Sequence, residues 1–266
     1  MVDQSSPEIL SIFIGYDARE ADAYAVCRRS MIRRSESPLH IQPLVADALR
    51  TNGLYRRSWR EENGQRIDHL DGRPFSTDFA FTRFLVPALT QYRGWALFVD
   101  CDFVFLDDVT RIFDLRDESK AVMVCQQTHK PAPGMKMDGQ AQTAYPRKNW
   151  SSLVLWNCEH PTNRLLTVEA VNREPGSWLH GFKWLRDEEI GDIPHQWNWI
   201  EGVTEGEPKA VHYTLGGPWF PHCQDVAYAD RWRGEHLLER HYESCSATND
   251  WVRSQFGAMQ RSWRRS

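Results

Sequence analysis

Hydrophobic positions along the chain form short apolar runs separated by longer segments with helical spacing. The first run, Ile9–Gly15, is continuously apolar and ends at a glycine, which predicts a buried strand. In the next segment, Ala18–Arg34, apolar residues recur among Arg and Glu and predict a helix. Leu39–Val45 predicts a second strand. A strand, a helix and a strand in close succession form a βαβ unit, which predicts a parallel sheet with a nucleotide-binding edge.

The most strand-like run is Trp95–Val99, which ends directly in Asp100-Cys101-Asp102. Two polar segments, Asp47–Pro74 and Gln126–Trp150, predict long loops, and loops of such length are usually functional. Phe103–Leu106 is again apolar and is followed by a turn at Asp107-Asp108. Further strands are expected at Ala121–Cys125, Ser151–Trp156 and Ala210–Tyr213, and helices at Ser76–Tyr92, Asn163–Asn172, Asp187–Ile190 and Arg231–Tyr242.

Composition narrows the class of protein. The chain has 266 residues, 41% hydrophobic and 26% charged, which is ordinary for a globular domain. Its net charge of -4 argues against a dedicated nucleic-acid binder, so no nucleic-acid partner is expected. Twelve Trp residues are many; aromatic faces can line sugar sites, although we expect most of the twelve to lie in the core or to anchor loops.

Six cysteines are scattered without CxxC spacing. Three of them, Cys101, Cys125 and Cys158, lie in apolar strand-like runs and are expected to be buried free thiols, which favours a reducing compartment. The polar N-terminus lacks the pattern of a signal peptide, and no apolar run approaches the roughly 20 residues that span a bilayer. These features predict a cytoplasmic protein.

The C-terminal segment Trp251–Ser266 is basic and aromatic. One interpretation is peripheral contact with an anionic surface, such as the inner face of a membrane. The other, slightly favoured, is a helix that packs its aromatic side chains on the body and leaves Arg solvated. We therefore expect a single domain over residues 1–250 and a tail over 251–266.

Asp100 and Asp102 are the leading candidates for chemistry. Two-residue spacing puts both carboxylates on one face of an extended chain, at the end of a strand, where open α/β sheets hold ligands. Two such carboxylates repel each other unless a cation lies between them. A hard divalent ion, Mn²⁺ or Mg²⁺, satisfies that need and can also bind a diphosphate. The alternative is a pair of surface Asp residues in a turn.

The stretch WALFVDCDFVFLDDVTRIFDL resembles the metal-binding segment of A-fold (GT-A) glycosyltransferases, in particular glycosyltransferase family eight, which includes lipopolysaccharide galactosyltransferases and glycogenin-like proteins. Other segments agree in order over roughly residues 9 to 220. The resemblance implies an α/β GT-A fold with a mixed, mostly parallel sheet flanked by helices. It also implies an enzyme that transfers a sugar from a nucleotide-sugar donor, UDP-linked, to a glycan or glycolipid acceptor with retention.

The resemblance assigns roles to residues before and after the metal segment. Tyr16 and Asp17 would hold the base, although Asp17 could also cap the following helix. Arg83 would face the donor phosphates or sugar, and Ser151–Asn157 would line the sugar. Asp100 would partly face the ribose.

Two later segments complete the implied site. Asp187 and Glu188 resemble an Asp-Gln-Asp segment near the reacting carbon, which is followed by Trp197 and Asn198. Glu188 replaces the family's Gln, so a carboxylate there could act as a nucleophile or stabilise positive charge, or Asp187 could hold that role.

His212, followed by Gly216, Pro218 and Trp219, resembles the late histidine segment. It implies His212 as the third metal ligand, with Gly216 and Trp219 at the donor. Gly217 stands where the family usually has a diphosphate-binding Lys, so that contact would pass to Arg83, His222 or a loop Arg.

Two other functions fit parts of this pattern. Asp-Cys-Asp-Phe-Val also matches the Asp-x-Asp-x-Val signature of haloacid-dehalogenase-type phosphatases, with Asp100 as nucleophile. That motif normally follows the first strand, whereas here about a hundred residues precede it. A non-catalytic protein that binds a nucleotide or glycan is the third hypothesis, and the presence of both Asp residues and His212 speaks against it.

Overall fold

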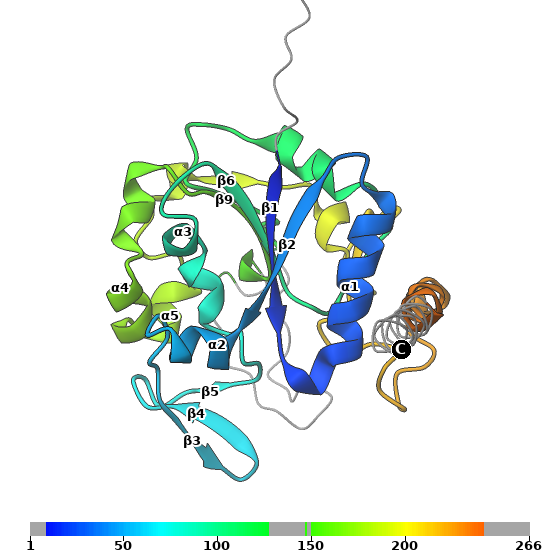
Figure 1. The fold of residues 1–266 in the computed structure, drawn as a ribbon, viewed down its shortest axis with the longest axis horizontal. Coiled ribbons are helices and arrows are strands. Elements are labelled where there is room, and N and C mark those ends of the chain that lie inside the picture. Colours follow the sequence, from blue (N-terminus) through cyan, green and yellow to red (C-terminus); the bar gives the residue numbers. More distant parts are fainter. Residues whose placement is uncertain (1–8, 128–146, 148–149, 242–266) are drawn as a thin grey trace, which may run out of the picture.

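The computed structural model describes residues 9–127, 147 and 150–241 of the chain. Its centre is a six-stranded sheet in the order β10-β8-β9-β6-β1-β2 (Figure 1). The strands are β1 (Leu10–Tyr16), β2 (Leu39–Val45), β6 (Trp95–Val99), β8 (Val122–Val124), β9 (Leu153–Asn157) and β10 (Ile190–Asp192). Only β9 runs against its neighbours β6 and β8; the other pairs in this sheet are parallel. The predicted mixed, mostly parallel α/β fold is confirmed.

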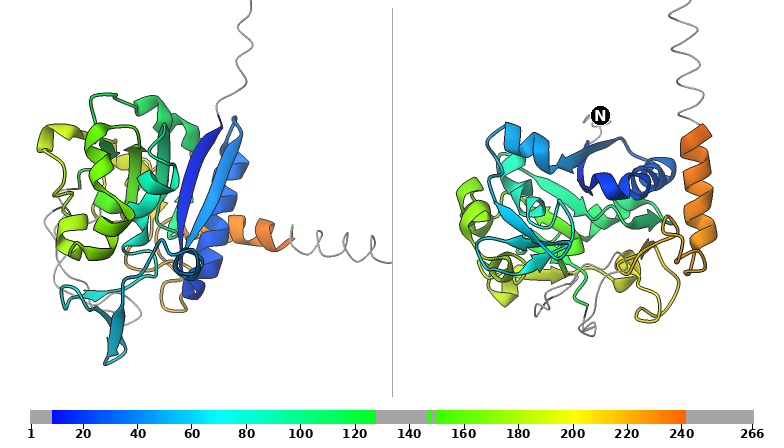
Figure 2. Two further views of the ribbon diagram at one scale, coloured as in Figure 1. Left: turned by 60° about the vertical axis from the view of Figure 1, so that its left-hand side comes forward. Right: turned by 90° about the horizontal axis from the view of Figure 1, so that it is seen from below.

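The predicted βαβ unit forms as expected. A 3₁₀ turn, Ala18–Glu20, leads from β1 into α1 (Ala21–Arg34), and β2 then pairs with β1 along its whole length. The helix buries Ala23, Val26, Cys27, Ser30 and Met31. It lies on one side of the sheet, while the shorter helices α3 (Val86–Leu89), α4 (Val168–Arg173) and α5 (Gly176–Leu179) lie on the other (Figure 2).

The middle of the sheet is the core of the molecule. Every residue of β9 is buried, as are the last four of β6, and the side chains of Phe98, Leu155 and Trp156 are fully shielded from solvent. A strand covered on both faces has no polar side, which explains why these segments appear in the sequence as continuous apolar runs. Because Asp100 directly follows buried β6, the core fixes its position.

The segment after β2 is more ordered than the loop predicted from Asp47–Pro74. It begins with α2 (Ala46–Thr51), and then β3 (Trp59–Glu62), β4 (Gln65–Asp68) and β5 (Pro74–Phe75) form a small antiparallel sheet that projects from the body (Figure 1). Asn63 and Gly64 join β3 to β4, both with positive φ, as a tight hairpin turn requires. All four residues of β3 are exposed and polar or amphipathic, so no alternating apolar pattern marks it in the sequence.

Two predicted helices are shorter than expected. Within Ser76–Tyr92, only the 3₁₀ turn Thr82–Leu85 and α3 are helical. Pro87 is tolerated in the first turn of α3 but could not lie inside a longer helix, because its ring would clash with a carbonyl one turn earlier. Asn163–Asn172 divides into a 3₁₀ turn, Pro161–Leu165, and α4, since the Thr167 hydroxyl caps α4 by accepting from the Ala170 amide.

Other elements are short. β7 (Phe103–Phe105) and β11 (Ala210–His212) form an antiparallel pair. The remaining 3₁₀ turns are Val109–Leu115, Trp150–Ser152, Asp187–Glu189 and His195–Asn198. Cys101, Cys125 and Cys158 are buried free thiols, as predicted, and so are the two other described cysteines, Cys27 and Cys223.

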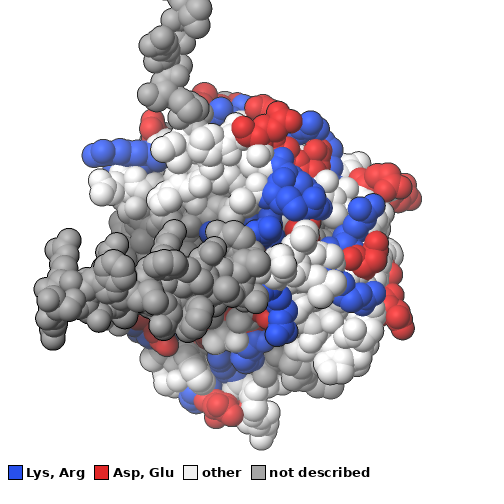
Figure 3. Space-filling model, turned by 45° about the vertical axis from the view of Figure 1, so that its right-hand side comes forward, with Lys and Arg blue, Asp and Glu red and all other residues white. Residues whose placement is uncertain are grey.

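A helix covers residues 229–241 and lies beside α1 (Figure 2, right). Its Glu235 carboxylate is 2% exposed and accepts from the guanidinium groups of Arg33 at 2.6 Å and Arg34 at 2.7 Å. Figure 3 shows the molecule with the right-hand side of Figure 1 turned forward. Over the described part of that surface, basic and acidic side chains are interspersed. No helix among the described residues is long and apolar enough to cross a bilayer. The predicted tail, 251–266, lies outside the described residues.

Candidate metal centre and adjoining pocket

Asp100 and Asp102 lie in the turn that joins β6 to β7. The Asp100 amide donates to the carbonyl of Ser152 at 2.9 Å, and the Asp102 carbonyl accepts from the amide of Tyr213 at 2.9 Å. Both bonds join the turn to distant parts of the chain. The backbone of the Asp-Cys-Asp segment is therefore fixed on both sides before any ligand binds.

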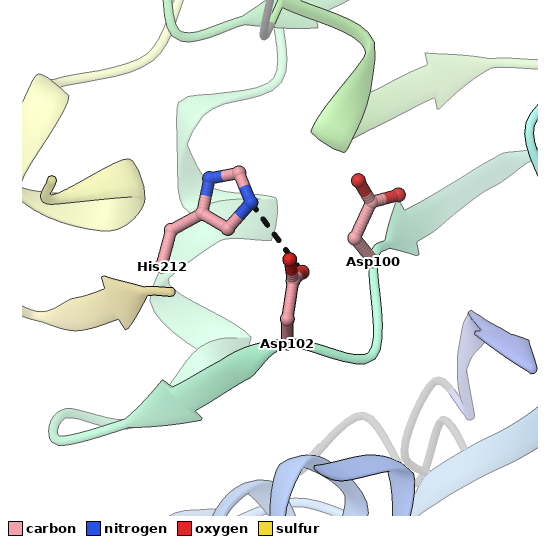
Figure 4. A group of neighbouring side chains, drawn as sticks. All are labelled: Asp100, Asp102 and His212. Atoms are coloured by element: carbon pink, nitrogen blue, oxygen red, sulfur yellow. Dashed lines mark ion pairs between the residues drawn. The ribbon is translucent and has the colours of Figure 1, made fainter. Parts of the chain in front are cut away.

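The structure brings both carboxylates to His212. One ligand atom from each of Asp100, Asp102 and His212 lies within 4.8 Å of the others, and the three side chains converge on one point (Figure 4). His212 reaches this point because β11 pairs with β7, with His212 opposite Phe103. The exposed fractions are 9% for Asp100, 7% for Asp102 and 4% for His212. Two carboxylates and one imidazole in a shielded position form a set of donors that could hold a divalent metal ion.

The hydrogen bonds of His212 fix its orientation. Its Nδ1 lies 2.8 Å from Oδ1 of Asn198, and the Asn198 amide nitrogen donates to the Ser152 hydroxyl at 3.2 Å, which assigns the amide oxygen to the histidine. Nδ1 therefore donates, and Nε2 faces Oδ1 of Asp102 at 3.3 Å. Phe103 stacks on the imidazole with 4.3 Å between ring centroids. A second ring nitrogen anchored in this way is typical of metal-binding histidines.

Arg83 is buried beside this centre. Its Nη1 lies 2.9 Å from Oδ1 of Asp100 and donates to the Ser151 carbonyl at 2.7 Å. The guanidinium also lies over the rings of Phe79 and Phe98. Asp100 is the anion against which Arg83 is buried. Arg83 therefore holds one of the two carboxylates in place. Its predicted contact with donor phosphates stays a prediction.

Tyr16 is the last residue of β1 rather than the residue after it, and Asp17 follows the strand directly. Asp17 is 1% exposed and caps the turn Ala18–Glu20, accepting from the amide of Arg19 at 3.0 Å and from its guanidinium at 2.7 Å. Burial by itself would raise the pKa of Asp17, but the hydrogen bonds from Arg19 outweigh it and hold that pKa below the usual value. Tyr16 packs edge-to-face on Tyr24. Base binding by either residue stays a prediction.

A pocket adjoins the metal centre at Asp102. It also brings together Gly216 and Trp219, two of the predicted site residues; its remaining lining residues are Glu20, Ser76, Thr77, Tyr213, Thr214, Leu215 and Phe220. Gly216 has a φ of 113°, which favours glycine. Among the residues that the structure describes, this lining includes no Lys or Arg.

Gly217 stands where the family that this chain resembles usually has a lysine, and the structure gives a steric reason for the glycine. A Cβ atom added to Gly217 would lie 2.0 Å from the indole ring of Trp219, so no side chain fits at that position without moving the ring. His222, one of the expected substitutes, is exposed and stacks on Phe220. Arg83 is a described cation that pairs with one of the two carboxylates of the cluster, that of Asp100.

Asp187 and Glu188 are not brought to the metal centre. β10 and β6 run in the same direction, because two antiparallel pairings and one parallel pairing separate them. Asp100 follows β6, whereas Asp187 and Glu188 precede β10. Asp100 and the two acidic residues therefore lie toward opposite ends of the strands. The Glu188 carbonyl accepts from Lys120, which precedes β8. The predicted role of Asp187 and Glu188 at the reacting carbon was not a role as metal ligands, and it stays a prediction.

Asp187 instead takes part in a surface contact. Its side chain is 81% exposed and pairs with the guanidinium of Arg147, which also donates to the Gly181 carbonyl at 3.1 Å. The next acidic residue, Glu189, is buried and accepts from the Thr162 hydroxyl at 2.7 Å and from the Arg186 amide at 2.8 Å. The acidic run therefore stabilises the start of β10.

Sequence reasoning missed three contributors. Asn198 appeared only as part of a Trp-Asn pair, and nothing in the sequence shows that its side chain meets His212. Ser152 was assigned to a strand, but its hydroxyl orients Asn198. In the sequence, Glu20 looks like an ordinary acidic residue in the first turn of a helix. Nothing local indicates that it lines the pocket.

Solved structures with this fold are glycosyltransferases. The bifunctional glycosyltransferase WbbM aligns with 89% of this chain at a TM-score of 0.60 and 11% identity, and GlyE of Streptococcus pneumoniae TIGR4 with 90% at 0.55 and 14%. The galactosyltransferase LgtC aligns with 86% at 0.54 and 15%. The alignment spans 50% of the WbbM chain, 64% of the GlyE chain and 96% of the LgtC chain. The chain therefore has the GT-A glycosyltransferase fold, as the resemblance implied.

A family relationship comes from sequence. The chain is 50% identical over 231 residues to protein CDI of Arabidopsis thaliana, with 84% of this chain and 85% of that protein covered. It belongs to the same family as protein CDI. No family model matches the sequence.

Proposed function

We propose that this protein is a metal-dependent glycosyltransferase of the hexosyltransferase type, which takes its sugar from a UDP-linked donor. The observation that carries the proposal is the convergence of Asp100, Asp102 and His212 within 4.8 Å at the edge of a GT-A sheet. Oxygen and imidazole donors suit Mn²⁺ or Mg²⁺, and a carboxylate pair in a shielded position calls for a cation.

The chain's own residues would prepare the site for the donor. Asp102 and His212 would bind the metal directly, and Asn198 would keep Nε2 of His212 available. Arg83 would hold Asp100 toward the same ion. When bound, the ion supplies Lewis-acid stabilisation of the negative charge on the departing nucleoside diphosphate. Because the described lining of the adjoining pocket includes no Lys or Arg, the ion would provide much of the charge that offsets the diphosphate.

The finer features rest on resemblance. Residues 1–250 would form one catalytic domain, Tyr16 and Asp17 would lie next to the base, and Gly216 and Trp219 next to the donor. The acceptor would be a glycan or glycolipid of polysaccharide biosynthesis, and transfer would retain the anomeric configuration. A cytoplasmic location and contact of the tail 251–266 with the inner membrane surface stay predictions from the sequence.

The test is calorimetry of UDP binding to the purified protein, with and without Mn²⁺. The wild type is compared with Asp102→Ala and with Asp107→Ala. Asp107 lies in the same acidic segment but pairs with Arg111 and Lys209 at the surface, so it is a matched control. We expect metal-dependent binding by the wild type and the control, and loss of binding in Asp102→Ala. A screen of UDP-sugars for metal-dependent hydrolysis then identifies the donor.

Three results would contradict the proposal. If UDP, GDP and CDP all fail to bind in the presence of metal, the nucleotide-sugar function is wrong. Metal-dependent release of inorganic phosphate from phosphomonoesters, abolished by Asp100→Asn, would support the phosphatase hypothesis instead. Binding of a nucleotide sugar without hydrolysis or transfer to any glycan would indicate a non-catalytic binder.

A further inference from the structure

The helix at residues 229–241 turns acidic side chains inward, toward α1. Trp232, Glu235 and Glu239 recur at the spacing of one helical face. Trp232 is 3% exposed and lies in an apolar cluster with Val26 of α1. Glu235 is paired with two arginines of α1, and the Glu239 carboxylate, 12% exposed, lies 3.8 Å from the guanidinium of Arg29. The arginines of α1 therefore offset the negative charge of this inner face.

The outer face of the same helix carries arginine and leucine. Arg233, Leu237 and Arg240 follow one another at helical spacing and are all exposed. Leu237 is 69% exposed, and the adjacent Leu238 is 43% exposed. Arg231, at the start of the helix, is 65% exposed. Two leucines thus lie in contact with solvent, with arginines before and after them in the sequence.

This distribution differs from that of an ordinary surface helix, which buries apolar side chains and exposes charged ones. Here a glutamate is buried while two leucines are exposed. Among the described residues of this helix, Asp230 is the exposed acidic residue, against three exposed arginines. The outer face is therefore positive, although the chain as a whole has a net charge of -4.

An anionic bilayer offers what such a face would bind. Its headgroup phosphates attract arginine, and the boundary between headgroups and acyl chains accepts leucine. The neighbouring helix α1 adds to the same chemistry, since Arg33 is 48% exposed and Ile32 is 43% exposed. A second copy of this chain suits the face less well, because a two-fold contact through it would bring the arginines of both copies together.

We infer that the outer face of the helix at residues 229–241 is a docking surface for an anionic phospholipid bilayer. Arg231, Arg233 and Arg240 contact the headgroup phosphates, and Leu237 and Leu238 enter the boundary below them. Docking needs neither metal nor nucleotide, so it is independent of the proposed function. It is also distinct from the contact predicted for the tail 251–266, because this surface belongs to the described helix.

The docking surface begins close to the metal centre. The helix starts directly after Tyr228, whose carbonyl accepts from the Tyr213 hydroxyl at 3.1 Å, and the Tyr213 amide donates to the Asp102 carbonyl. A bilayer at this surface would keep a glycolipid acceptor near the metal. This consequence, unlike the docking itself, rests on the proposed function.

The experiment is co-sedimentation of the full-length protein with lipid vesicles, without nucleotide or metal. Vesicles of phosphatidylcholine with phosphatidylserine are compared with vesicles of phosphatidylcholine alone. We expect the wild type to prefer the anionic vesicles and to lose this preference as the salt concentration rises, because salt screens charges at a surface.

Two double variants separate the two parts of the surface. Arg233→Gln with Arg240→Gln should lower the partition coefficient for anionic vesicles roughly 10- to 30-fold, the range for two arginines at such a membrane, and should weaken its salt dependence. Leu237→Ser with Leu238→Ser should lower the coefficient roughly 10-fold and leave the salt dependence as in the wild type, because insertion of apolar groups is not screened.

Matched controls change the same residue types elsewhere. Leu165→Ser alters a leucine that is 58% exposed, in the turn before α4. Arg60→Gln with Arg173→Gln removes two exposed arginines, each of which pairs with a glutamate. Both controls should bind vesicles as the wild type does. Thermal unfolding confirms that each variant is folded.

A further variant tests the tail in the full-length chain, with Arg261, Arg264 and Arg265 each changed to Gln. Under the inference it keeps a preference for anionic vesicles that depends on the leucines and arginines of the helix. Loss of vesicle binding in this variant, together with wild-type binding by both helix variants, would assign the contact to the tail and overturn the inference.

Other results also overturn it. A wild type that does not sediment with anionic vesicles, or that binds both kinds of vesicle equally, has no such docking surface. A wild type that binds no vesicles and forms dimers, which the leucine variant does not form, shows that the face binds a second copy. None of these results concerns UDP binding, so the proposed function stands or falls separately.

Discussion

The imidazole of His212 is anchored by Asn198, with 2.8 Å between Nδ1 of the histidine and Oδ1 of the amide. The two residues lie on different elements, His212 on β11 and Asn198 in the turn His195–Asn198, and both are buried. Since the bond uses Nδ1, it leaves the Nε2 lone pair facing Asp102. A proposed metal ligand is therefore set in one tautomer and one orientation by a neutral side chain.

Replacement of this anchor should weaken metal binding. Asn198→Leu removes the acceptor for Nδ1 and frees the ring to change tautomer, so we expect the Mn²⁺ dissociation constant to rise roughly 10- to 100-fold. Titration followed by electron paramagnetic resonance of free Mn²⁺ gives this value. Asn163→Leu is the control, since it deletes an equally buried amide that bonds to Ala121 and Asn157 instead. Equal Mn²⁺ affinity in the two variants would disprove the anchoring role.

Arg83 should contribute to stability through Asp100. Arg83→Met keeps much of the side-chain length but leaves Asp100 without its guanidinium partner in a buried position, which should cost about 3 kcal/mol of the free energy of unfolding. Mn²⁺ should restore part of this loss, because the ion replaces the missing positive charge. Chemical denaturation with and without Mn²⁺ measures both effects. Arg111→Met, at an exposed pair with Asp107, should change stability by less than about 1 kcal/mol. A variant that gains no more from Mn²⁺ than the wild type would contradict the link to the metal centre.

Glu189 should make the protein sensitive to acid. Burial acts to raise the pKa of Glu189, but hydrogen bonds from the Arg186 amide and the Thr162 hydroxyl outweigh it and lower that pKa from 4.5 to about 2. Because the folded-state pKa is depressed, the stabilisation is fully present above about pH 4.5 and is lost as the pH falls toward about 2.

Replacement of this carboxylate tests the sign of the effect. Glu189→Gln should lower the free energy of unfolding by roughly 2 kcal/mol at neutral pH and should flatten its pH dependence below pH about 4.5. Urea denaturation across the acidic range gives both quantities. Glu188→Gln, at the exposed neighbouring position, should leave the curve unchanged. An acid dependence that persists in Glu189→Gln would assign it to another group.

Glu235 should hold the helix at residues 229–241 against α1. Its buried carboxylate accepts from both Arg33 and Arg34, so Glu235→Ala leaves two guanidinium groups without their common anion and should cost about 2 kcal/mol. Hydrogen exchange in 229–241 should increase while exchange in β6 and β9 stays slow. Asp230→Ala, at an exposed position of the same helix, is the control. Equal exchange in both variants would show that apolar packing alone docks the helix.

The sequence by itself determined the framework of the sheet and two of the three residues of the candidate metal centre. β2 and β6 have the bounds expected from their sequences. For β6 the reason is burial on both faces, because a strand buried in this way contains few polar residues. The spacing of Asp100 and Asp102 after such a run predicted that both carboxylates meet at a sheet edge. These features depend on local periodicity, which a sequence displays directly.

The resemblance named His212 as a third ligand, but only the tertiary structure shows how distant residues meet the two carboxylates. His212 meets Asp102, and Asn198 orients His212, because β11 pairs with β7, and strand pairing between segments about a hundred residues apart leaves no local signal. Asp187 and Glu188 are not part of the cluster of Asp100, Asp102 and His212. They precede β10, and the direction of β10 places its start at the other end of the strands from Asp100. Strand direction follows from the order of pairing across the whole sheet, so the same short acidic motif can lie at either edge until the topology is known.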